Sequence, residues 1–314
     1  MNQFNFCIAL LRNLFYATIR KLIGRSRFRR YVYYGKRIKG EKFTNEFIYQ
    51  SILSGNPFLV ARFGDTELRT VLYSIEHSMG FRNSIPSYIK EKMKINAGFF
   101  PTDDRYMYKF GELMLESSKF VDLFATWHNI MEDYVIFHTN KNAELCYLEN
   151  IDPFRSKMPW TKALKGKRVL VVHPFAVSIA KQYLLREKLF DNKDMLPEFE
   201  LITYKAIQTQ AGATSCYDTW FDALDKMFND IKAIEFDIAI LGCGAYGFPL
   251  AAKIKQLGKQ AIHLGGATQI LFGIKGARWD AKPEISELYN DYWIRPSSDE
   301  RPKDADKVEG ACYW

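Results

Sequence analysis

The chain has 314 residues, of which 47% are hydrophobic and 25% charged, so it holds enough apolar material for a sizeable core and is not a disordered protein. The net charge of +8 comes from one segment. Residues 1–40 hold ten Lys and Arg and no acid, which leaves 34 basic and 36 acidic residues in the rest. A general nucleic-acid-binding surface is therefore not implied, and we expect no nucleic-acid partner.

Cysteine and histidine usage restricts the chemistry further. The five cysteines form no C-x-x-C pair, and their odd number favours a reducing cytoplasm over a disulfide framework. The five histidines form no cluster with cysteines, so no zinc site is predicted.

Residues 1–40 are predicted to form a basic, amphipathic, helical arm. Arg12, Arg20 and Lys21 interrupt its apolar runs, which are too short to span a bilayer. The basic residues follow the apolar run instead of preceding it, unlike a secretory signal. Two interpretations stay open: a helix lying on an anionic membrane, at the inner face of the cytoplasmic membrane, or a helix packed on the protein body.

Residues 41–314 are expected to form a single α/β domain. In chain order, we predict a helix at 45–54, a strand at 58–62 and a helix at 66–78. Residues 80–165 are predicted to be a mostly helical insertion with one short strand near 134–138.

Strands and helices alternate from residue 168 on. The predicted strands are 168–172, 199–203, 237–241 and 260–264, and the predicted helices are 177–190, 217–232 and 248–257. This order is typical of βαβ units, so we expect a Rossmann-like fold with a mainly parallel sheet flanked by helices. Residues 296–309 are predicted to be loop, with 311–314 anchored by their aromatic side chains.

A glycine turn follows the strand at 237–241. Gly242, Gly244 and Gly247 match G-x-G-x-x-G, in which the backbone closes on a diphosphate at a helix N-terminus. The acid that would bind a dinucleotide ribose is replaced by Gly265-Gly266, and residues 238–279 contain no Asp or Glu. The turn predicts phosphate binding without dinucleotide recognition, or only close packing of a strand on a helix.

Two other enzyme classes use similar turns. The letters LGCG suggest a nucleotide-dependent methyltransferase, but its usual acid and its further glycine are missing. A nicotinamide oxidoreductase is disfavoured by the missing ribose acid. Both remain alternatives.

A second glycine turn follows the strand at 260–264. Backbone NH groups and cations gather there without an acid, a combination that suits a diphosphate, while a solvated basic loop is the alternative. The candidate residues are His263, Gly265, Gly266, Gln269, Lys275 and Arg278.

An acidic motif follows the strand at 58–62. In Arg62-Phe63-Gly64-Asp65-Thr66-Glu67, two carboxylates two residues apart can share Mg²⁺ or Mn²⁺ with substrate phosphates. The alternative is structural: Asp65 as a helix N-cap, with Glu67 favoured by the helix dipole.

Four motifs in order resemble the bacterial glycosyltransferases of the GT-D type. They are LVARFGDTEL, LVVHPF, the run LGCGAYGFPLAAKIKQLGKQAIHLGGATQILFGIKGARWD, and WIRP with VEGACYW. The resemblance covers residues 58–314, is least distinctive at 80–165 and excludes the basic arm.

The resemblance implies transfer of a sugar from a nucleoside-diphosphate sugar, with an Asp-x-Glu motif that acts through a divalent cation. By position, that motif is Asp65 and Glu67, which would be catalytic and hold Mn²⁺ or Mg²⁺. A UDP-sugar is the favoured donor, and a glycan or lipid-linked glycan in surface polysaccharide or glycoprotein assembly is the expected acceptor. Arg62, Gly64 and the two glycine turns would line the donor site.

An inverting reaction also needs a base for the acceptor hydroxyl, for which Asp280 and His263 are equal candidates. A non-catalytic nucleotide-binding scaffold that uses the basic arm is the non-enzyme alternative.

Overall fold

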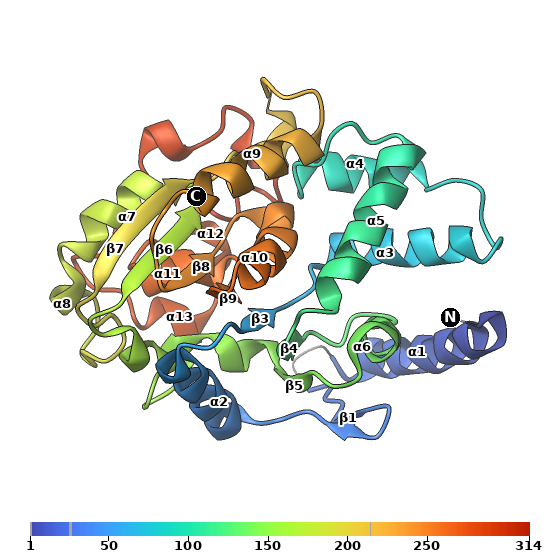
Figure 1. The fold of residues 1–314 in the computed structure, drawn as a ribbon, viewed down its shortest axis with the longest axis horizontal. Helices are drawn as coiled ribbons and strands as arrows, with labels where there is room; N and C mark the ends of the chain where they lie inside the picture. Colours follow the sequence, from blue (N-terminus) through green and yellow to red (C-terminus); the bar gives the residue numbers. More distant parts are fainter. Residues whose placement is uncertain (1, 25–26, 214) are drawn as a thin grey trace.

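A seven-stranded parallel sheet forms the centre of the protein in the computed structural model, which describes residues 2–24, 27–213 and 215–314 (Figure 1). The strand order is β5-β4-β3-β9-β8-β6-β7. The strands are β3 (Leu59–Ala61), β4 (Leu123–Thr126), β5 (Glu144–Tyr147), β6 (Arg168–His173), β7 (Glu200–Lys205), β8 (Ile238–Leu241) and β9 (Gln260–His263). A separate antiparallel pair joins β1 (Val32–Tyr33) and β2 (Lys36–Arg37).

Helices cover both faces of the sheet because successive strand residues point to opposite sides. Ala61, Phe124 and Leu241 face one core, and Val60, Leu123 and Ile240 face the other. The first core is covered by α3 (Asp65–Ser78), α4 (Ser87–Ile95), α5 (Asp104–Ser118), α6 (Glu132–Asn140), α9 (Trp220–Lys232) and α10 (Gly247–Gln256). The second is covered by α2 (Glu41–Ser54), α7 (Ala176–Tyr183), α8 (Arg186–Leu189), α11 (Ala267–Leu271), α12 (Ala277–Asp280) and α13 (Pro283–Ser286). The predicted Rossmann-like α/β class is confirmed.

The stretch 80–165 differs from the prediction. The strand expected near 134–138 is wrong, because these residues lie in α6. Most of α6 is buried, so its apolar residues show no periodicity that separates a helix from a strand. The same stretch supplies β4 and β5 to the main sheet, and each has only four residues.

The order of the strands reverses beside β3. The chain runs outward from β3 to β4 and β5, and returns to pair β9 with β3, where Leu59 lies opposite Ala261. In open α/β sheets, such a reversal leaves a crevice at the carboxyl ends of the strands. The turns after β3 and β9, which carry the acidic motif and the second glycine turn, therefore meet there.

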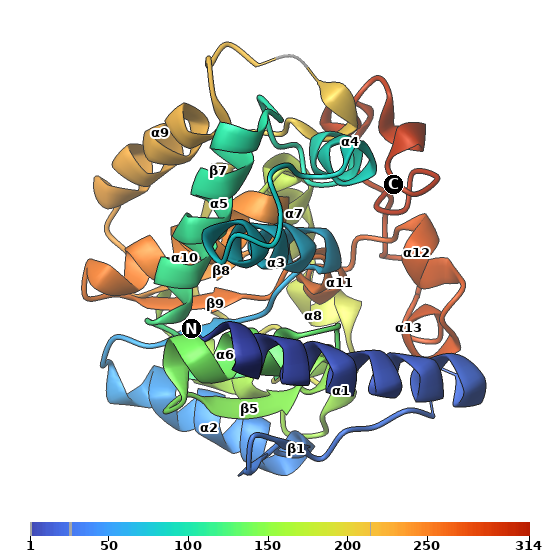
Figure 2. The ribbon, with the colours of Figure 1, turned by 90° about the vertical axis from the view of Figure 1, so that its right-hand side faces the viewer.

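The predicted arm contains one long helix, α1 (Gln3–Ile23), which packs on the protein body near α6 (Figure 2). Phe6 joins the first core, and Arg12 and Arg30 both pair with the buried carboxylate of Asp133, at 2.7 and 2.5 Å. Arg25, another basic residue of the arm, lies outside the described residues. No helix of the described chain is both long and apolar enough to cross a bilayer.

Candidate functional site

A cleft of about 610 Å³ opens along the carboxyl ends of the central strands. Its lining includes residues that follow β3, β4, β8 and β9, among them Arg62, Trp127, Gly244 and Gly266. Because the strands are parallel, these segments meet at one edge of the sheet, where ligands of open α/β folds bind. The cleft is therefore the candidate site.

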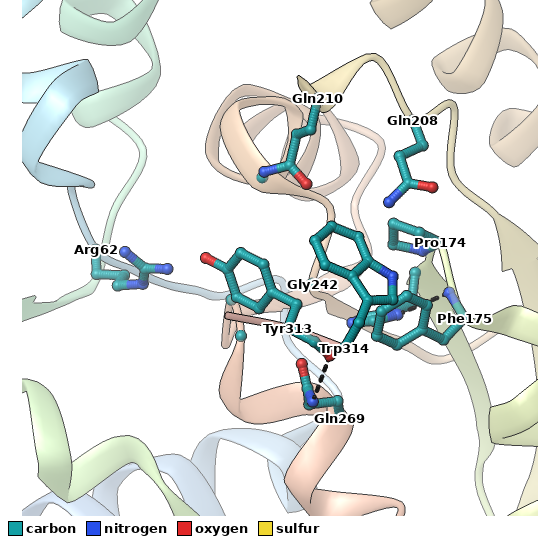
Figure 3. A pocket seen from close by; sticks show the side chains of 13 residues that line it. Arg62, Pro174, Phe175, Gln208, Gln210, Gly242, Gln269, Tyr313 and Trp314 are labelled. Atoms are coloured by element: carbon teal, nitrogen blue, oxygen red, sulfur yellow. Dashed lines mark hydrogen bonds between the residues drawn. The ribbon is translucent and has the colours of Figure 1, made fainter. Parts of the chain in front are cut away.

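One side of the site is a glycine wall, formed by Gly242, Gly244, Gly265 and Gly266 after β8 and β9. All four line a recess of about 50 Å³ beside the cleft (Figure 3). Gly265 has a φ of +67°, and a Cβ there would lie 2.3 Å from Nη2 of Arg62. The missing side chain thus lets the Arg62 guanidinium lie against this backbone.

The C-terminal segment shapes the recess. Tyr313 and Trp314 lie at its centre in Figure 3, and the dashed line joins the Gln269 amide to the Tyr313 carbonyl. Gln269 is fully buried and also donates to the carbonyls of Ile274 and Lys275, at 3.3 and 3.2 Å. Its amide nitrogen therefore holds neighbouring backbone in place.

Arg278 brings a cation to the opening of the cleft. Its Nη1 donates to the Tyr313 hydroxyl at 3.1 Å, and its guanidinium forms an ion pair with Glu309. Arg278 and Arg62 thus place two guanidiniums among the cleft-lining residues, a group that binds phosphate oxygens well.

Carboxylates line the rest of the cleft. Glu309 pairs with Arg278, and the other four, which we call the acidic wall, are Asp65, Glu67, Glu149 and Asp152. Gly64, not Asp65, is the N-cap of α3, so the structural alternative in which Asp65 caps the helix is wrong. The Asp65 carboxylate is 42% exposed and pairs with Arg69 at 3.0 Å. Both predicted carboxylates lie in the first turn, where the helix dipole stabilises negative charge.

Glu67 folds back over the start of its helix. A Cβ at Gly64 would lie 2.0 Å from Glu67 Oε2, so only glycine leaves room for this carboxylate. Burial raises the pKa of Glu67, while Arg62 lowers it and Asp65 and Glu309 raise it. The carboxylates and the Arg62 guanidinium therefore share one electrostatic environment.

The carboxylates of Asp65 and Glu67 are too few to hold a hard cation without further ligands. Within the described ranges, no group of three or more His, Cys, Asp or Glu side chains is arranged to hold a metal. Two carboxylates suit Mg²⁺ or Mn²⁺ where phosphates and water complete the coordination shell. Asp65 and Glu67 could therefore hold such a cation only if further ligands, such as phosphate oxygens and water, completed its shell.

Asp152 is a cleft residue that the sequence did not reveal. Arg155 Nε donates to it at 3.3 Å, and burial raises its pKa to about 6 against the opposing charges of Arg155, Lys282 and Arg62. Burial also lowers the pKa of Lys282, with Arg278 and Arg155 adding to the effect. The three-residue spacing of Glu149, Asp152 and Arg155 resembles an ordinary polar surface, so only the fold shows that they line the cleft.

His263 and Gly247 form a packed pair. His263 lines the cleft, and burial, followed by the charge of Arg62, lowers its pKa well below the usual value. Neither ring nitrogen has a hydrogen-bond partner among the described residues. Gly247 lies outside the lining, and a Cβ there would lie 2.5 Å from the His263 ring, so this glycine makes room for the imidazole.

Two candidates lie away from the cleft lining. The Lys275 amino group lies 5.2 Å from the centroid of the Tyr289 ring. Asp280, a predicted base, pairs with Arg295 and accepts a hydrogen bond from the Tyr289 hydroxyl at 3.2 Å. Of the two predicted bases, His263 therefore belongs to the cleft lining and Asp280 does not, although both ring nitrogens of His263 are buried.

The loop after β4 forms another part of the lining, with Trp127 and Asn129. Glu132 accepts from the Trp127 NH at 2.9 Å, and Arg20 of α1 donates to the carbonyls of Trp127 and His128, at 3.2 and 2.8 Å. The N-terminal arm therefore holds a loop of the candidate site.

Fold and site together define a Rossmann-like α/β protein with one cleft at the carboxyl edge of its sheet. No known family model matches the chain, and a search of curated proteins finds no related sequence. Two solved structures are similar, each at 13% identity over 86% of this chain and 94% of the other. One is a selenomethionine-substituted structure of domain of unknown function 1792 (TM-score 0.42), and the other is described as that domain with a distinct glycosyltransferase fold (TM-score 0.43). At this low sequence identity and TM-score, the similarity supports no conclusion beyond the fold class that the structure already shows.

Proposed function

We propose that the protein is a metal-dependent glycosyltransferase that moves a sugar from a nucleoside-diphosphate sugar, a UDP-sugar by preference, to a glycan or lipid-linked glycan. The observation that supports this most is the meeting of two chemistries in one cleft: a glycine wall with guanidiniums, and an acidic wall headed by Asp65 and Glu67. The ordered motifs that resemble GT-D glycosyltransferases support it independently. Surface polysaccharide or glycoprotein assembly is the proposed setting.

The glycine wall would bind the diphosphate. Backbone at Gly244 and Gly266 lines both the cleft and the recess, so main-chain groups are available to a phosphate beside the side chains of Gln210 and Tyr313. Arg62 and Arg278 would stabilise the negative charge that develops on the leaving nucleotide. This role suits guanidiniums because they stay charged at any working pH.

The acidic wall would hold the cation and the acceptor. Asp65 and Glu67 are the proposed ligands of Mn²⁺ or Mg²⁺, which supplies positive charge against the leaving diphosphate. Asp152 is the proposed group that accepts the proton of the acceptor hydroxyl. A carboxyl with a pKa near 6 is ionised at neutral pH and still basic enough for this role.

Thermal unfolding against a ligand panel tests the proposal. The panel holds UDP, GDP, their common sugars, NAD and S-adenosylmethionine, each with and without Mn²⁺. A ligand at 100 times its dissociation constant adds about 2.7 kcal/mol of stability, which raises the midpoint by several degrees. We expect a Mn²⁺-dependent increase with a uridine nucleotide, lost in Asp65→Asn.

Asp230→Asn is the matched control. Asp230 also pairs with a residue four positions away on its helix, Lys226, and is similarly exposed, but it lies outside the cleft lining. This variant should keep the ligand response. An increase with NAD or S-adenosylmethionine alone would instead support the oxidoreductase or methyltransferase. Donor binding without transfer or hydrolysis would support a scaffold.

A further inference from the structure

The outward face of α1 carries an apolar stripe. Phe4, Leu11, Phe15 and Leu22 are 70%, 69%, 63% and 80% exposed, and Ile8 lies between them. These five residues follow one another at intervals of four, three, four and seven, so they lie along one side of the helix. Large apolar side chains gathered in this way on a surface mark an interaction site.

Contacts made by the opposite face of α1 hold the helix in an orientation that exposes the stripe to solvent. Phe6, Ala9 and Asn13 are buried against the body, and the Asn13 amide donates to Asp133 at 2.9 Å while its oxygen accepts from the Met131 NH at 3.0 Å. The helix therefore cannot turn the stripe inward without breaking buried polar contacts. Figure 2 shows α1 in front of α6, with β5 below it in the view.

The charges around the stripe are positive. Residues 1–40 contain no acid, and both Lys21 and Arg27 are exposed. Beneath the helix, Arg12 and Arg30 share the carboxylate of Asp133, and burial raises the pKa of the neighbouring Glu132 to about 7, so the carboxylates there do not outnumber the two guanidiniums. An apolar strip with basic flanks is complementary to an anionic lipid surface, where acyl chains lie beneath negative headgroups.

We propose that α1 docks the protein on an anionic phospholipid membrane, with its axis in the membrane plane and the stripe inserted among the lipids. A helix of 21 residues is about 31 Å long, so a stripe about 10 Å wide covers roughly 300 Å². Stable protein interfaces bury about 800 Å² per partner, so the stripe alone is too small to hold a second copy. A lipid surface needs no such matched area.

Docking also positions the cleft. Arg20, on the body side of α1, holds the carbonyls of the loop that carries Trp127. The same helix that binds lipid therefore contacts the lining of the candidate site, which keeps the cleft close to the membrane surface.

Vesicle co-sedimentation with the full chain tests this proposal without any sugar donor, so its outcome is independent of the proposed function. We expect binding to vesicles of phosphatidylglycerol and phosphatidylcholine, weaker binding to phosphatidylcholine alone, and weakening by salt. The triple variant Leu11→Ser, Phe15→Ser, Leu22→Ser should bind at least tenfold more weakly. Lys21→Glu with Arg27→Glu should remove most of the preference for anionic lipid.

Leu184→Ser with Met158→Ser is the matched control. Both side chains are exposed, at 79% and 74%, but they lie outside α1, so binding should be unchanged. Circular dichroism and thermal unfolding check that every variant is folded. Absence of binding by the parent chain overturns the proposal, as does a triple variant that binds normally. Light scattering that shows a dimer lost in the triple variant, without vesicle binding by the parent, would assign the stripe to a second copy instead.

Discussion

The two walls of the cleft come from different halves of the chain and have opposite chemistry. The glycine wall follows β8 and β9, in a stretch without any acid from residue 238 to residue 279. The acidic wall follows β3 and β5 and holds four carboxylates. The NH groups of Gly242 and Gly265 already donate to the carbonyls of Val172 and Leu241, so Gly244 and Gly266 are the positions of this wall at which a ligand can meet the backbone.

Burial acts on both walls in the same direction, toward the neutral form. It lowers the pKa of His173 to about 3 beneath the glycine wall and raises the pKa of Asp152 to about 6 in the acidic wall. The acidic wall is nevertheless open to solvent at Asp65 and Glu149, whose side chains are 42% and 35% exposed.

The largest expected effect comes from removing a charge from the acidic wall. Asp65→Asn should lower the rate of sugar transfer at least 100-fold, the usual scale for losing one group that stabilises transition-state charge. Its thermal unfolding midpoint should stay close to that of the parent, because the ion pair with Arg69 is exposed and contributes little. Initial rates at saturating Mn²⁺ provide the measurement, and full activity in this variant would refute a role for Asp65 in holding the cation.

The pH dependence of stability tests whether burial raises the pKa of Asp152. Because its folded pKa is raised to about 6, its stabilising contribution is present at low pH and is lost as pH rises through 6. Asp152→Asn should therefore gain stability relative to the parent on going from pH 4 to pH 7, by up to about 3 kcal/mol for a shift of about two pKa units.

Urea unfolding at both pH values measures this difference. Asp230→Asn should show little change between these pH values. The hydrogen bond from Lys226 lowers the pKa of that exposed carboxyl from its usual 3.8, so its contribution to stability is lost only at lower pH. Parallel pH curves for the parent and Asp152→Asn would contradict the burial of Asp152.

A smaller effect is expected from substituting a glycine of the glycine wall. It distinguishes a clash of the new Cβ with a neighbour from the strain of a positive φ. Gly265 and Gly258 both have positive φ, +67° and +79°, so alanine at either position should cost about 1 kcal/mol of stability. Only at Gly265 would the new Cβ press on the Arg62 guanidinium, whereas Gly258 has nothing within 4 Å. Gly265→Ala should therefore also weaken donor binding about tenfold, while Gly258→Ala leaves it unchanged. Calorimetric titration with the donor distinguishes the two variants, and equal affinities would show that Arg62 does not contact the donor.

The sequence predicted the second half of the fold well because its signals are local. The strands β6, β8 and β9 are apolar runs ended by glycine or histidine turns, and α10 begins at the glycine motif. By contrast, β4 and β5 stand among helices and have only four residues each. A run of four residues is too short to show the alternation of apolar and polar residues that identifies a strand.

The residues of the candidate site also divide into those that a local motif predicted and those that no local motif predicted. Asp65, Glu67 and most of the glycines stand in recognisable motifs, and the fold brings them to one cleft. Asp152 and Trp127 carry no motif, and Tyr313, although it stands in VEGACYW, reaches the cleft only through contacts between distant segments, such as Arg278 with Tyr313. Such contacts form only when the sheet is complete, so the spacing of residues within a short stretch of sequence does not predict them.

The pairing of β3 with β9 has a consequence for how the protein folds. Leu59 lies opposite Ala261, so one edge of β3 stays open until a strand made about 200 residues later arrives. At ribosomal rates, this takes about 10 to 40 s, during which an apolar strand edge can recruit other chains. Pairing at such long range is slow to form, since the entropy of closing the loop is lost before the contact is made. Production of the protein should therefore depend on chaperones that shield nascent strands, and slower translation should increase the aggregated fraction.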